Sequence, residues 1–266
     1  MKRYARLSLI PVILFACLIA VASAQSPTSS LDTAKLEQSL TVIDLFELNR
    51  FESALKELLK DKSSRERYLY QLHLGRIYLR TALYYENKAE ENKALQKTSG
   101  TLANQARDQF KQLVRENKNL SDGYVYLAMA YAQKIRQVGY PTLLRYAKQV
   151  EENIKKALEK DPANPRAYLV QGIQNLYKPP QHGGGIDKAI PLLLKSVELD
   201  PAFHEGYYWL ARAYIQNSFA GKDENKAKDY LKKALELSPH DYFYQQGLTP
   251  GVQVPVYKVE EKPSNK

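Results

Sequence analysis

Side chains that act as nucleophiles or metal ligands are few and far apart in this chain. The sequence has four histidines, His73, His182, His204 and His240, and a single cysteine, Cys17. None of the histidines has another histidine three or four residues away, which is the spacing that a helical metal site needs. No serine stands in a Gly-x-Ser-x-Gly turn. The sequence therefore predicts no catalytic residues, no metal site and no cofactor.

Side chains suited to binding are better represented. The chain holds 20 tyrosines against 7 phenylalanines and one tryptophan, and it carries a formal net charge of +10. Aromatic and arginine side chains dominate binding hot spots because they offer rigid contact area and forked hydrogen bonds. We expect about two thirds of the tyrosines to be core residues. The function of the others depends on the elements that position them.

A sequence motif that occurs three times identifies the elements that position these side chains. The segments 157–162, 196–201 and 234–239 share one pattern that ends in proline, at intervals of 39 and 38 residues. A fixed period of this size indicates stacked helical hairpins. Proline is excluded from helix interiors but fits the first turn of the next helix, so each copy marks a joint between two helices.

The rest of the chain from Ser30 onward has apolar residues at three- and four-residue spacing, which is typical of helices. We expect about ten helices in five hairpins. The predicted joints lie near Asn49, 62–64, 97–100, 117–122, 139–141, 161–165, 178–185, 200–201, 221–222 and 238–239.

The last two hairpins align with one another residue for residue. Tyr168, Gly172, Ala189, Leu193, Ser196 and Pro201 in the first correspond to Tyr207, Ala211, Ala227, Leu231, Ala234 and Pro239 in the second. This pattern resembles the tetratricopeptide repeat (TPR). The resemblance implies an all-α fold, a right-handed α-solenoid of stacked antiparallel helical hairpins. We expect it to span residues 31–247, followed by a flexible tail over residues 248–266, where prolines and scattered charges replace the apolar spacing.

In TPR proteins the first helix of each hairpin lines the concave face of the superhelix. The resemblance therefore implies a binding face for a protein or peptide partner. The residues expected there are Arg76, Arg80, Tyr126, Met129, Arg166, Tyr177, Tyr208, Trp209 and Arg212, with His73, Gln133, Ile173 and Gln216 beside them. Four arginines would suit an extended peptide with carboxylates, or an acidic small ligand. The alternative is that several of these arginines pair with neighbouring glutamates of the chain itself.

The segment 178–185, Lys-Pro-Pro-Gln-His-Gly-Gly-Gly, interrupts the repeats. A glycine run before a helix can present backbone N–H groups to an anion. The segment lacks a Gly-Lys-Ser/Thr ending and does not follow a strand, which favours a shaped connector. It is loosely similar to the insertion of some bacterial envelope repeat proteins, including the TPR component associated with tripartite (TRAP) solute transporters.

The N-terminus has the pattern of a secretory signal peptide. Lys2, Arg3 and Arg6 precede an apolar stretch over residues 7–21, and small residues precede Gln25. We expect cleavage after Ala24, a periplasmic or secreted mature protein, and no transmembrane helix after cleavage. A retained membrane anchor and a lipid anchor at Cys17 are the alternatives.

Removing residues 1–24 would lower the formal charge to +10 − 3 = +7, which still favours acidic partners. Nucleic-acid binding has weaker support. Lys155, Lys156, Lys232 and Lys233 alternate with acidic residues, which is typical of a solvated helix surface. The favoured reading is an exported scaffold for a protein or peptide of the cell envelope. The second is an accessory protein that binds an acidic small solute for a transporter.

Overall fold

The computed structural model describes residues 31–61, 65–89, 92–135, 137–216 and 221–247, and these residues form helices and no strand. The helices are α1 (Thr33–Val42), α2 (Leu45–Leu58), α3 (Arg67–Ala89), α4 (Lys93–Glu116), α5 (Ser121–Ile135), α6 (Tyr140–Lys160), α7 (Pro165–Tyr177), a 3-10 turn (Pro180–His182), α8 (Ile186–Leu199), α9 (His204–Tyr214), α10 (Glu224–Leu237) and α11 (Tyr242–Gln245). All of them belong to the unit that begins at Thr33. The predicted signal peptide and the predicted tail lie outside the described residues.

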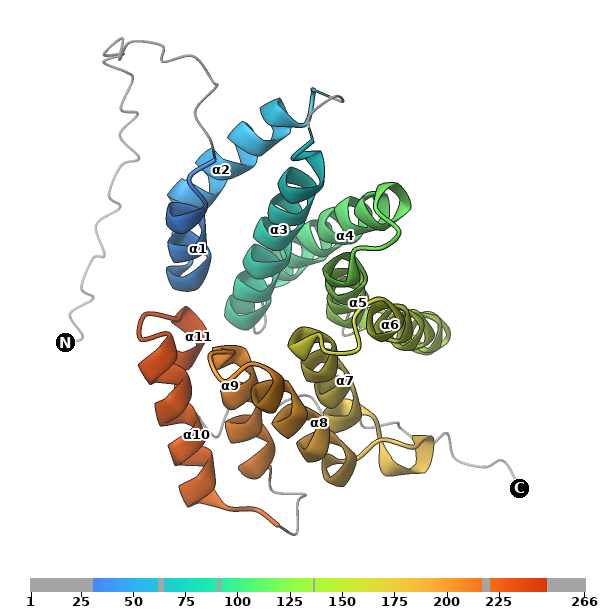
Figure 1. Ribbon diagram of the computed structural model, residues 1–266, viewed down its shortest axis with the longest axis vertical. Coiled ribbons are helices and arrows are strands. Elements are labelled where there is room, and N and C mark those ends of the chain that lie inside the picture. Colours follow the sequence, from blue (N-terminus) through green and yellow to red (C-terminus); the bar gives the residue numbers. More distant parts are fainter. Residues whose placement is uncertain (1–30, 62–64, 90–91, 136, 217–220, 248–266) are drawn as a thin grey trace, which may run out of the picture. The chain divides into compact units, whose positions relative to one another are not determined.

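Successive helices pack as hairpins, α1 with α2, α3 with α4, α5 with α6, α7 with α8 and α9 with α10 (Figure 1). The first helices α3, α5, α7 and α9 also contact one another in that order. The predicted fold class, an α-solenoid of stacked antiparallel hairpins of the TPR type, is confirmed. Among the described helices, none combines the length and the hydropathy that a membrane span requires.

Three tyrosines at equivalent places show the repeat in atomic detail. The hydroxyls of Tyr124, Tyr168 and Tyr207 each donate to the backbone carbonyl six residues earlier, at 3.1–3.2 Å. Each bond ties the first turn of a first helix to the joint before it. Part of the high tyrosine content is thus explained by one structural position used three times.

Close helix crossing explains the glycine at the small position of two first helices. A Cβ atom on Gly172 would lie 2.7 Å from Leu193, and a Cβ atom on Gly75 would overlap the fully buried Phe110 ring. In each hairpin a large residue of the second helix fills the space that the glycine leaves.

Two predicted joints were wrong. The chain turns at Ile43, whose φ is +59°, and Asp44 then caps α2 by accepting hydrogen bonds from Phe46 N and Glu47 N. Helix α2 therefore continues through Asn49. In the same way Asn92 caps α4, and the buried residues of α4 keep helical spacing across 97–100. The sequence expectation failed because Asn and Gly were taken as breakers where capping and packing continue the helix.

The glycine-rich segment is a connector. The N–H groups of Gly183 and Gly184 donate to carbonyls of the two prolines before them, and Gly185 N donates to Asn175 O at 2.8 Å. Gly183 and Gly185 have φ values of +84° and +120°, a conformation that favours glycine. The three amides that would hold an anion thus already donate to carbonyls of the loop and of α7.

Candidate binding face

The predicted arginines lie on first helices, and three of them pair with carboxylates of other elements. Arg76 of α3 makes a forked pair with Glu37 of α1, with Nη2 at 2.7 Å from Oε2. Arg166 of α7 donates to Glu205 of α9 at 2.6 Å. Arg76, Arg166 and Glu205 are half-buried, with 21–30% of their side-chain surface exposed, whereas Glu37 is exposed. The structure thus contains the alternative predicted for these arginines, which is pairing with carboxylates of the chain itself.

Tyr126 of α5 joins the two pairs. Its ring centroid lies 5.8 Å from the Arg76 guanidinium carbon and 5.3 Å from that of Arg166, within the range of cation–π contacts. Phe110 stacks on the same ring at 5.4 Å, and Tyr126 itself is 7% exposed. One buried tyrosine therefore connects the first helices α3, α5 and α7.

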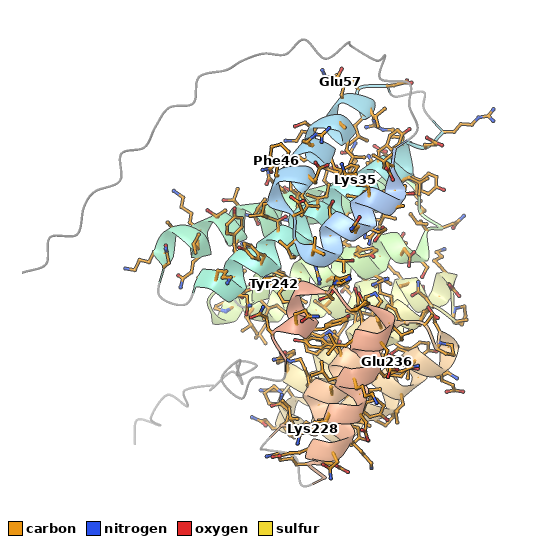
Figure 2. The ribbon with its side chains drawn as sticks, turned by 90° about the vertical axis from the view of Figure 1, so that its left-hand side faces the viewer. Lys35, Phe46, Glu57, Lys228, Glu236 and Tyr242 are labelled. Carbon is orange, nitrogen blue, oxygen red and sulfur yellow. The ribbon has the colours of Figure 1, made fainter. Side chains whose placement is uncertain are left out.

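The third arginine, Arg80, holds the last helix. Its Nη2 lies 2.6 Å from Asp241 Oδ2, its Nε donates to Leu40 O at 3.0 Å, and its guanidinium lies 4.4 Å from the Phe243 ring centre. Asp241 also caps α11 by accepting from Phe243 N. One side chain of α3 thus connects α1 with α11. Tyr242 of α11, which is labelled in Figure 2, also contacts Tyr84 of α3, with 5.3 Å between the ring centres. We call Arg76, Arg80 and Arg166, together with Glu37, Glu205 and Asp241, the arginine band.

The titration of the band follows from this pairing. Burial favours the neutral form of Glu205, yet Arg166 and His204 hold the pKa of Glu205 below its ordinary value. Burial opposes and Arg76 favours the charge of Glu37, and the pKa of Glu37 is likewise lowered. Burial and the adjacent Arg76 lower the pKa of His73, so this histidine is neutral at pH 7. Asp241 differs from the two glutamates, because its burial raises its pKa against the opposing effect of Arg80.

The other predicted residues form a different surface. Tyr177 of α7 and Trp209 of α9 meet edge to face at 6.1 Å, and Tyr208 lies 6.0 Å from Trp209. The guanidinium carbon of Arg212 lies 5.5 Å from the Trp209 ring and 5.8 Å from that of Tyr208, and its Nη1 donates to Tyr208 Oη at 3.1 Å. Tyr177, Trp209 and Arg212 are half-buried, whereas Tyr208 is buried against Tyr244 at 4.6 Å. We call Tyr177, Tyr208, Trp209 and Arg212 the aromatic face.

Met129 and the remaining predicted neighbours are also placed, and Gln216 Nε2 donates to Arg212 O at 3.2 Å. Met129 and Ile173 are half-buried, and Gln133 is buried with its amide bonded to Glu86. Sequence reasoning missed Glu37, Glu205 and Asp241. Two of the three carried a signal, because Glu37 and Glu205 each lie 39 residues from the arginine that they pair with, one repeat length apart.

Two cavities in the described part of the chain lie away from the aromatic face. One, of about 480 Å³, lies between α6 and α7, and the other, of about 590 Å³, lies where α3, α4 and α5 come together. Among the described residues there is no group of three or more His, Cys, Asp or Glu side chains arranged to hold a metal ion.

Comparisons with known proteins support the fold. No family model matches the chain, and no curated protein matches it significantly. The structure is similar to that of TTC0263, a thermophilic TPR protein of Thermus thermophilus, with 23% identity and a TM-score of 0.55 over 79% of this chain and 95% of that one. Weaker likenesses are to the HusA haemophore of Porphyromonas gingivalis (19% identity, TM-score 0.49, 78% and 92% covered) and to MamA (20% identity, TM-score 0.39, 71% and 86% covered).

Proposed function

We propose that this protein is an exported TPR scaffold that binds a protein or peptide partner at the aromatic face. The observation that carries the proposal is the clustering of Tyr177, Trp209 and Arg212 on neighbouring first helices, half-buried and in mutual contact. Rigid aromatic side chains beside an arginine are the residues that dominate binding energies at interfaces. Contacts with one another hold them in place before a partner arrives, which lowers the entropic cost of binding.

The arginine band is a less suitable binding surface than the aromatic face. Its guanidinium groups already have carboxylate partners, so an acidic peptide would have to displace a charge of the protein itself. Arg212 lies beside the rings of Trp209 and Tyr208 and donates to the Tyr208 hydroxyl. Its positive charge within the aromatic face favours an acidic group of the partner at this place.

The test is affinity capture from an envelope extract with the mature chain, residues 25–266, beside the double variant Trp209→Ala/Arg212→Ala. We expect the variant to recover at least about tenfold less partner than the unchanged chain, because loss of a hot-spot residue typically weakens binding by that much. The matched control is Leu144→Ala/Arg145→Ala on α6, which makes the same two kinds of change at exposed positions. Equal capture by both variants would place the binding site elsewhere.

The second candidate function is binding of an acidic small solute for a transporter. It rests on the loose resemblance of the segment 178–185 to TRAP-associated TPR proteins and on the positive charge of the chain. A metabolite recovered from the purified protein, with no protein captured, would favour this function over the scaffold.

Export is part of the proposal. The charged start, the apolar residues 7–21 and the small residues before Gln25 support a signal peptide cleaved after Ala24. Mass spectrometry of the protein from cell fractions tests this. A mature chain that begins at Gln25 supports cleavage there, whereas a lipid-modified chain that begins at Cys17 would support the anchored alternative.

A further inference from the structure

A polar cavity lies at the junction of three helices, on residues outside the arginine band and the aromatic face. It has a volume of about 590 Å³ and is formed by the end of α3, the start of α4 and the end of α5. Cavities of this size hold small organic ligands in other proteins. Its lining consists of Glu86, Ala89, Lys93, Gln96, Lys97, Ser99, Gly100, Lys134 and Gln137. We call this the lysine cavity.

Positive charge dominates the lining. Three lysines, Lys93, Lys97 and Lys134, face one carboxylate, Glu86, which accepts a hydrogen bond from Gln133. Across the described ranges of the chain none of the three lysines forms an ion pair, whereas Lys56, Lys155 and Lys195 on other helices each pair with a glutamate. The cavity therefore holds a charge that the described residues leave unbalanced.

Lys134 places part of this unbalanced positive charge in a buried position, where charge is unfavourable. It is 9% exposed, and its Nζ donates to Gln137 Oε1 at 3.1 Å. Burial lowers the pKa of Lys134, and the positive charge of Arg107 acts in the same direction. A buried ammonium group that is bonded to an amide rather than to a carboxylate is stabilised when an anion binds next to it.

The polar groups around Lys134 are held in place. Gln137 Nε2 donates to Ser99 Oγ at 3.2 Å, and Ser99 Oγ donates to Ala82 O at 2.9 Å. This chain of bonds turns Gln137 Oε1 toward the lysine. The floor of the cavity is thus formed by fixed side chains of α4, of α5 and of the turn that follows α5.

Gly100 explains how these groups come so close. It stands inside α4, where glycine costs about 1 kcal/mol relative to alanine. A Cβ atom at this position would lie 3.2 Å from Gln137 Oε1 and 3.9 Å from Lys134 Nζ. The glycine that the sequence suggested as a joint is a helical residue that leaves room for the lysine and the amide.

We propose that the lysine cavity binds a small anion that carries two or more negative charges, a di- or tricarboxylate or a phosphate. Two exposed lysines at the rim and one buried lysine at the floor supply three charges around one space. Lysine ammonium groups act as point charges and suit both carboxylate and phosphate oxygens. This site is independent of the proposed partner-binding face.

The test is isothermal titration calorimetry of the purified mature chain with succinate, citrate and inorganic phosphate, each at constant ionic strength in sodium chloride. We expect saturable binding of at least one of them, and the comparison separates carboxylate from phosphate recognition. Lys134→Met, which keeps the length of the side chain and removes its charge, should weaken binding at least about tenfold, since a hydrogen bond to a charged group is lost.

Two more variants keep the test decisive if Lys134→Met does not fold. Lys93→Gln/Lys97→Gln changes two exposed residues and should weaken binding several-fold, and Gly100→Ala should weaken it by narrowing the floor. Lys232→Gln/Lys233→Gln on α10 removes the same charge at exposed positions and should leave binding unchanged. Absence of saturable binding to all three anions, or equal affinity in the cavity variants and the α10 control, would overturn the proposal.

Discussion

The arginine band and the aromatic face lie on the same series of first helices, yet they use arginine in opposite ways. In the band, Arg76, Arg80 and Arg166 are each joined to a carboxylate of another element at 2.5–2.6 Å. In the aromatic face, Arg212 lies against Trp209 and Tyr208. The same residue type therefore pairs with carboxylates in one region and packs among aromatic rings in the other.

The comparison teaches that a residue's helix position does not decide its role. All four arginines occupy first helices of a repeat, which the sequence predicts to form a binding face. What separates them is the surroundings that each guanidinium meets, a carboxylate of another element in the band and aromatic rings in the face. Variants in the band should therefore lower stability, and variants in the aromatic face should lower binding.

The largest expected effect is that of Asp241→Ala in the band. Its side chain is only 4% exposed, pairs with Arg80 and caps α11, so the variant should lower the free energy of unfolding by about 2–4 kcal/mol. Asp241→Asn keeps the capping oxygen and should cost less. Urea unfolding measures both, and a loss below about 1 kcal/mol for the alanine variant would contradict the role of the band.

Glu205→Gln should have a smaller effect, about 1–2 kcal/mol, because Glu205 and Arg166 remain 30% and 24% exposed to water. Capture of a partner should change little. The matched control is Glu236→Gln on α10 (Figure 2), whose pair with Lys233 is about half exposed and should contribute less than about 0.5 kcal/mol. If the two variants unfold at the same urea concentration, the band pairs are ordinary surface pairs.

Acid should weaken the band through the same carboxylates. The pKa of Glu37 and that of Glu205 are lowered in the folded protein, so the stability they contribute is present above 4.5 and is lost as the pH falls through the lowered values. The melting temperature should therefore fall below pH 4.5, the ordinary value for glutamate, and it should fall less steeply in Glu205→Gln. Parallel curves for the two proteins would argue against this linkage.

The smallest effect is expected for Tyr177→Ala in the aromatic face. Tyr177 lies at the edge of the face and contacts Trp209, so its loss should lower partner affinity about fivefold, or about 1 kcal/mol. Its effect on stability should be about 1 kcal/mol or less, because Tyr177 is half-buried. Urea unfolding and quantitative capture measure the two effects. A large loss of stability with unchanged capture would reverse the assignment of the two regions.

Local residue patterns predicted much of the fold. Prolines at regular intervals located the joints of the last hairpins, and Tyr168 and Tyr207 marked equivalent first turns, as their matching hydrogen bonds confirm. Asn49 and Gly100 led to wrong predictions of helix joints. Their local preference is for breaks, but Asp44 and Asn92 cap the helices that contain them.

What the sequence by itself determined is the helical repeat and the set of first-helix residues, because periodic apolar spacing and proline joints act over short range. It carried a partial signal for the pairs Arg76–Glu37 and Arg166–Glu205, each one repeat length apart. Only the tertiary structure decided that Arg80 meets Asp241, 161 residues later, and that Lys134 and Gly100 share one cavity. Such contacts depend on how hairpins stack, and stacking is set by packing across the whole unit rather than by local sequence.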